Sequence, residues 1–107
     1  MNMNQIIEIL RDGGFDVSDH GAGHNMVKFS NGYEMSISYA DGNYCSNRHA
    51  LGPRDFGLSH NGEIAFHSPE QDFLDFYGSD GGVRGYVSAD EILGIVIGIK
   101  MAFAAVK

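Results

Sequence analysis

The sequence is poor in cysteine, tryptophan and cationic residues. Its 107 residues include one cysteine, no tryptophan, and seven lysines and arginines against fourteen aspartates and glutamates. A single cysteine cannot form a disulfide within the chain. The formal charge of −7 argues against direct binding of nucleic acid, because that binding depends on cationic side chains that neutralise phosphates. The same charge favours a partner with a basic surface.

Long hydrophobic runs are also missing. The most apolar segment, 92–106, contains Lys100 and falls short of the roughly 20 residues that span a bilayer, so we expect no membrane segment. The N-terminus carries no signal-peptide pattern, which together with the lone cysteine predicts a reducing, cytoplasmic setting. The length and the 43% hydrophobic content predict one globular domain over residues 1–107.

The first residues have the apolar spacing of a helix. Hydrophobic side chains recur at intervals of three and four from Met3 to Leu10, which places them on one helical face. Asn2 or Asn4 can cap the start of this helix, and Gly13 is expected to end it.

A hairpin is predicted around the three-residue loop 30–32. This loop length pairs Val27 with Met35 on one face and Lys28 with Glu34 on the other, whereas a two-residue loop would mix apolar and polar residues. The loop needs a residue in the left-handed region, and its glycine supplies one.

The same reasoning predicts a second hairpin and two further strands. A loop at 60–62 would join strands 55–59 and 63–67. Two more short strands, 72–77 and 83–87, are expected on either side of a glycine-rich turn.

A closing helix is predicted over 89–106. The spacing from Ser88 to Glu91 is that of a capping box. Within the helix, small residues form a stripe that would let another backbone approach closely, either the sheet or a second copy of the helix in a homodimer. The predicted fold is therefore α+β: an N-terminal helix, an antiparallel sheet of about five to six short strands, and a C-terminal helix packed on one face. The stripe consists of Gly94, Gly98, Ala102 and Ala105.

The segment DGNYCSNRH, residues 41–49, raises the question of a chemical site. Cys45 and His49 could join His20 and His24 in a zinc site, but the paired spacings typical of zinc ligands are absent. Cys45 could also act as a nucleophile with His49 or His67 as base, although its neighbours match no nucleophile signature. We therefore predict no metal, no cofactor and no catalytic residue, and expect Cys45 to point inward in an ordered corner.

Polar residues in the predicted loops and on the strand 72–77 are candidates for binding a partner. Carboxylates spaced along a stiff strand can mimic a row of phosphates, so the acidic surface could act as a DNA mimic. Arginine beside an aromatic ring is suited to gripping a partner's carboxylates or a nucleotide. The predicted partner-binding residues are Tyr44, Arg48, His49, Glu70, Asp72, Asp75, Asp80 and Arg84.

One alternative is a small-ligand binder that sequesters a nucleotide signal. Its site would be lined by Tyr44, Arg48 and Arg84, with Arg54 in a neighbouring loop. The glycine-rich stretch 78–85 matches neither the Walker pattern nor GxGxxG, so it is a weak signal for phosphate binding. A cysteine-dependent enzyme is the other alternative.

Two stretches resemble small bacteriophage and prophage accessory proteins. NGYEMSISYADGNYCSNRH, residues 31–49, is similar to a turn, strand and GNYC-type loop in those proteins. The stretch from GEIAFH to VRGYVSADEI, residues 62–92, is similar to their second half. The family is largely uncharacterised, so the resemblance implies no catalytic residue. It implies a phage-encoded, non-enzymatic inhibitor that binds a host antiviral defence protein, of the anti-CRISPR type.

Overall fold

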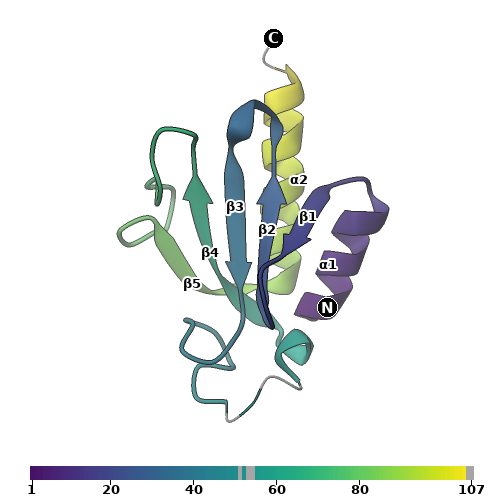
Figure 1. Ribbon diagram of the computed structural model, residues 1–107, viewed down its shortest axis with the longest axis vertical. Helices are drawn as coiled ribbons and strands as arrows, with labels where there is room; N and C mark the ends of the chain where they lie inside the picture. The colour runs from purple at the N-terminus through teal and green to yellow at the C-terminus, as the bar shows by residue number, and fades with distance from the viewer. Residues whose placement is uncertain (51, 53–54, 106–107) are drawn as a thin grey trace.

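The computed structural model describes residues 1–50, 52 and 55–105, and it has the predicted α+β architecture (Figure 1). Five antiparallel strands form one sheet in chain order, β1-β2-β3-β4-β5, between two helices in the sequence. Two predicted features, the loop position of Arg54 and the helix end at Val106, lie outside the described residues. The elements are α1 (Met3–Asp12), β1 (Asp16–Asp19), β2 (His24–Lys28), β3 (Glu34–Ser38), β4 (Asn61–His67), β5 (Val83–Ser88) and α2 (Ala89–Ala105).

The N-terminal helix begins and ends as predicted. The Asn2 side chain accepts a 2.9 Å hydrogen bond from the Gln5 backbone, and the Gln5 side chain accepts one of 2.9 Å from the Asn2 backbone. This reciprocal capping satisfies two N–H groups at the start of the helix, and Gly13 follows its last turn. The face that α1 buries consists of Met3, Ile6, Ile7 and Leu10.

The hairpin of β2 and β3 has the predicted register. Val27 pairs with Met35, and Lys28 pairs with Glu34. The three-residue loop Ser30–Gly32 forms a 3-10 turn, and Gly32 has a φ of +79°. The apolar pair therefore enters the core while the charged pair lies on the opposite face.

The predicted second hairpin is wrong. Residues 56–58 form a 3-10 turn, and β4 begins at Asn61, inside the expected loop. β4 pairs instead with β3 on one side and β5 on the other. The segment before it docks on the first helix, where Met3 N–H donates a 2.9 Å hydrogen bond to Ser59 O. A central strand with two neighbours satisfies more backbone groups than a local hairpin would.

The expected strand at 72–77 is also wrong. Residues 68–82 form an irregular segment, hereafter the acidic loop, between β4 and β5. Phe73 has a φ of +56°, which is incompatible with an extended strand. The carboxylates of this loop therefore lie on irregular backbone rather than on a strand. The expected strand 83–87 is present as β5, and β1 is a strand that the sequence pattern did not indicate.

The core lies between one face of the sheet and the two helices. Val27, Ile37 and Ile64 on the sheet belong to one buried cluster with residues of α1 and α2, including Leu10 and Val96. Within the described ranges, no helix combines the length and the apolar character needed to cross a bilayer.

Candidate functional site

Residues 39–49, which follow β3, form a hydrogen-bonded corner around Cys45. The Asn47 side chain donates hydrogen bonds of 2.6 Å to Tyr39 O and 2.9 Å to Phe56 O. The Asn43 side chain donates one of 3.0 Å to Glu63. Side-chain amides thus replace regular backbone pairing here. As predicted, Cys45 points inward and is buried.

The environment of Cys45 does not favour nucleophilic chemistry. Burial raises the pKa of the thiol, and a hydrogen bond from the Asn47 backbone only partly opposes this effect. The thiol donates a 3.6 Å hydrogen bond to Ala40 O. Because the thiolate is the attacking form of cysteine, a buried thiol with a raised pKa behaves as a small core residue.

The candidate zinc ligands are not brought together. In the part of the chain that the structure describes, no three histidine, cysteine or carboxylate side chains form a cluster that could hold a metal ion. His20 instead lies 2.9 Å from the Ser18 hydroxyl, and His24 lies 3.3 Å from the Ser38 hydroxyl. Both histidines therefore contact serine side chains at the sheet and not the other candidate metal ligands.

Tyr44, Arg48 and His49 emerge from the corner on its outer side, as expected. Tyr44 and His49 are exposed, and Arg48 is half-buried. The guanidinium carbon of Arg48 lies 4.3 Å from the centre of the Tyr44 ring, a cation–π contact. Arg48 also donates a 3.2 Å hydrogen bond to Gly42 O, so the arginine holds the tyrosine ring in place.

Tyr44 and Tyr86 share a recess of about 390 Å³, hereafter the tyrosine recess. Tyr86 N–H donates a 2.8 Å hydrogen bond to Tyr44 O. Gly85 lies so close to Tyr44 that a Cβ at this position would collide with Tyr44 Cβ. The close approach of β5 to Tyr44 therefore requires glycine at position 85. Tyr86 itself has a φ of +53°, a strained conformation for a bulky residue. The recess is lined by Tyr44, Asp80, Val83, Gly85 and Tyr86.

Asp80 is the one predicted carboxylate that joins the two tyrosines in the recess. Its backbone exchanges hydrogen bonds of 2.7 and 3.2 Å with Val83, which fix its position. Glu70, Asp72 and Asp75 are exposed elsewhere on the acidic loop, and Asp72 lies 3.4 Å from His67.

Arg84 lies apart from Arg48 and Tyr44. Its guanidinium donates a 2.9 Å hydrogen bond to Glu91 on α2, whereas the tyrosine recess is lined by its two neighbours in β5, Val83 and Gly85. Because alternate residues of a strand point to opposite faces, the nucleotide site expected from Tyr44, Arg48 and Arg84 is not assembled.

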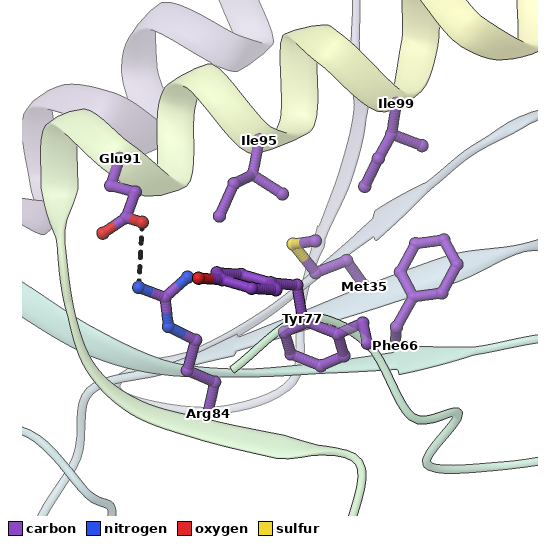
Figure 2. A pocket seen from close by; sticks show the side chains of 8 residues that line it. Met35, Phe66, Tyr77, Arg84, Glu91, Ile95 and Ile99 are labelled. Carbon is purple, nitrogen blue, oxygen red and sulfur yellow. Dashed lines mark hydrogen bonds and ion pairs between the residues drawn. The ribbon is translucent and has the colours of Figure 1, made fainter. Parts of the chain in front are cut away.

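Arg84 instead closes one end of an apolar cleft between α2 and the sheet, hereafter the helix cleft (Figure 2). The cleft has a volume of about 430 Å³. Ile95 and Ile99 project into it from the helix, and Met35 and Phe66 project from the sheet. The residues that line the helix cleft are Met35, Phe66, Phe76, Tyr77, Arg84, Glu91, Ile95 and Ile99.

The structure also brings together a serine, a histidine and an aspartate that no motif in the sequence links. Ser36 Oγ lies 3.4 Å from His67 Nε2, and Asp72 Oδ1 lies 3.4 Å from Nδ1 of the same ring. However, Phe73 N–H donates to Nδ1 at 3.2 Å, and the Ser36 hydroxyl donates to Ala65 O. Because Nδ1 accepts from the Phe73 backbone, the three side chains lack the hydrogen-bond order of a catalytic triad, in which the carboxylate accepts from Nδ1–H. The group anchors the acidic loop.

The described part of the small-residue stripe of α2, which is Gly94, Gly98 and Ala102, faces outward, while the side chain of Ala105 lies outside the described residues. Among the described residues, a Cβ added at Gly94 or Gly98 would meet no neighbouring atom within 4 Å, and Ala102 is exposed. Ile97 and Met101 lie beside them and expose 41% and 67% of their surface to solvent. The stripe therefore does not seat the helix against the sheet, which was one of its two expected roles.

Comparisons of the chain with known protein families, with curated protein sequences and with solved structures find no match.

Proposed function

We propose that the chain is a non-enzymatic binding domain that docks on a basic surface of a partner protein. The observation that carries the proposal is the tyrosine recess, which the exposed residues Tyr44, Tyr86 and Asp80 help to line. Tyrosine is enriched at the centres of protein interfaces, and a ring beside a carboxylate suits a lysine or arginine side chain.

The acidic loop supplies the longer-range part of this recognition. Glu70, Asp72 and Asp75 are exposed on it, and the whole chain has a formal charge of −7. Complementary charge raises the association rate and aligns the partners. The loop is not a strand, so the proposed mimicry depends on the charge itself rather than on a regular spacing of carboxylates.

A narrower form of the proposal names the partner as a protein of a bacterial antiviral defence system. In this form the chain is a phage-encoded inhibitor that acts in the cytoplasm of the host. This form rests on the resemblance of residues 31–49 and 62–92 to phage accessory proteins. It predicts that expression of the chain restores plaque formation by a phage that a CRISPR system targets.

Binding to purified defence complexes tests the docking surface. The Asp72→Ala/Asp75→Ala variant should bind a captured complex at least tenfold more weakly, and added salt should weaken wild-type binding. The control variant Glu8→Ala/Asp12→Ala removes two exposed carboxylates from α1 and should bind almost normally. Equal losses in both variants would show that net charge, and not this loop, decides binding.

A homodimer through α2 is a second part of the proposal. The helix is apolar on its outer face, at Gly94, Ile97, Gly98, Met101 and Ala102, and an exposed helix with apolar residues all round normally has a covering partner. Two glycines one turn apart would let a second copy of the helix approach closely.

A further inference from the structure

The helix cleft is an apolar groove with one charged end. Glu91, Ile95 and Ile99 follow one another at intervals of four residues and therefore line one face of α2. Eight residues of helix span about 12 Å, so the groove runs roughly that distance from the Arg84–Glu91 pair to Ile99. Figure 2 shows the ion pair at one end of the groove and Phe66 with Ile99 at the other.

The volume of the cleft suits a small ligand. The cleft has a free volume of about 430 Å³. Ligand sites usually enclose about 300–1,000 Å³ and combine apolar walls with a few placed polar groups. The walls here are almost wholly apolar, so the main part of a ligand must be hydrocarbon.

The Arg84–Glu91 end of the helix cleft determines which polar head group a ligand can carry. Arg84 has five N–H donors, and within the described residues its guanidinium has one hydrogen-bond acceptor, Glu91. The first turn of α2 lies at the same end, and a helix N-terminus also favours negative charge. A second carboxylate can therefore bind Arg84 alongside or in place of Glu91.

Tyr77 marks the mouth of the groove. Its side chain is 94% exposed, although it lines the cleft, and its hydroxyl points toward the Arg84 guanidinium (Figure 2). A ligand seated in the groove would cover part of this ring and exclude water from it.

We infer from these observations that the helix cleft binds a medium-chain amphiphile with a carboxylate head, with its hydrocarbon between α2 and the sheet and its head at Arg84. The helix cleft and the tyrosine recess share no lining residue. A test of ligand binding in the cleft is therefore independent of the proposed docking function.

A single introduced tryptophan reports on the site, because the chain has none. In a Tyr77→Trp variant, decanoate below its micelle-forming concentration should give a saturable blue shift of the emission. Decanol should bind at least tenfold more weakly, and decyltrimethylammonium more weakly still. A Tyr86→Trp variant places the reporter in the tyrosine recess and should not respond. Absence of a saturable shift, or preference for the cationic head, would overturn the inference.

Variants made in the Tyr77→Trp background test the two ends of the groove. Arg84→Gln should remove the preference for decanoate over decanol, while Glu91→Gln should tighten decanoate binding severalfold because a competing carboxylate is lost. Ile99→Phe should block the apolar end, whereas Ile97→Phe, on the outer face of the same helix, should not. Circular dichroism checks the fold of each variant. If Glu91→Gln leaves decanoate affinity unchanged and Ile97→Phe weakens it as much as Ile99→Phe, the proposed site is wrong.

Discussion

The Asn25 side-chain amide donates a 2.6 Å hydrogen bond to the Tyr39 hydroxyl, and this contact joins β2 to the chain beyond β3 in the interior. Both residues are buried. Among the described residues, Asn25 Oδ1 has no hydrogen-bond partner. The contact with Tyr39 is therefore the main compensation for burying this amide, since buried polar groups are costly when unpaired.

Replacement of Tyr39 by phenylalanine should destabilise the fold. The substitution keeps the ring but leaves the Asn25 amide without its acceptor, at a cost of about 1–3 kcal/mol in the free energy of unfolding. Urea unfolding measures the change. Tyr77→Phe is the control, because the exposed Tyr77 hydroxyl should contribute less than about 0.5 kcal/mol. Equal effects of the two substitutions would contradict the role assigned to the buried pair.

Stability should fall at alkaline pH. Burial raises the pKa of the Cys45 thiol and that of the Tyr39 hydroxyl above their ordinary values. A group whose pKa is raised in the folded state contributes stability that is complete below its unfolded pKa and is lost as the pH rises toward the folded pKa. The free energy of unfolding should therefore decrease above about pH 9.

The contribution of the thiol can be separated from that of the tyrosine. Cys45→Ala should lower stability at neutral pH by leaving a small cavity, but it should make the decline that begins above about pH 9 shallower. Tyr39→Phe should flatten the curve mainly above pH 10. Chemical unfolding at a series of pH values gives these slopes, and an unchanged alkaline slope in both variants would disprove the assignment.

Features that depend on local sequence were predictable. The helix cap at Asn2 and the register of Val27 with Met35 follow from residues only a few positions apart. The pairing of β3 with β4 joins Ile37 to Ile64 across a long connection, and local patterns carry no information about such contacts. A hairpin at 60–62 was therefore predicted where β4 instead inserts between two other strands.

The same limit applies to the candidate sites. Loop residues such as Tyr44 were identified as exposed, but their grouping with Asp80 and Tyr86 depends on how β5 lies against the corner. The separation of Arg84 from Arg48 depends on the register of β5. The helix cleft could not be predicted, because Met35 and Ile99 look like ordinary core residues in the sequence.

The loop glycine of the first hairpin should be sensitive to substitution for two reasons. Gly32 has a φ of +79°, and an added Cβ would lie 2.7 Å from Pro69 Cγ. Gly14 has a similar φ of +85°, but an added Cβ would meet no neighbouring atom within 4 Å in the part of the chain that the structure describes. Gly14→Ala therefore measures the backbone strain alone, about 1 kcal/mol, and Gly32→Ala should cost more. Thermal unfolding of both variants makes the comparison, and an equal loss would show that the Pro69 contact is unimportant.

The outward stripe of α2 gives a direct test of self-association. Because a Cβ added at Gly98 would meet no atom of another described element within 4 Å, a leucine there should leave the monomer folded and even favour the helix by up to about 1 kcal/mol. In a dimer that brings two copies of the helix together at this glycine, the leucine should separate them. Sedimentation should therefore show a dimer for the wild type and a folded monomer for Gly98→Leu. Gly98→Ala is the control, since alanine improves the helix but still permits close approach. A monomeric wild type, or a dimeric Gly98→Leu variant, would exclude this interface.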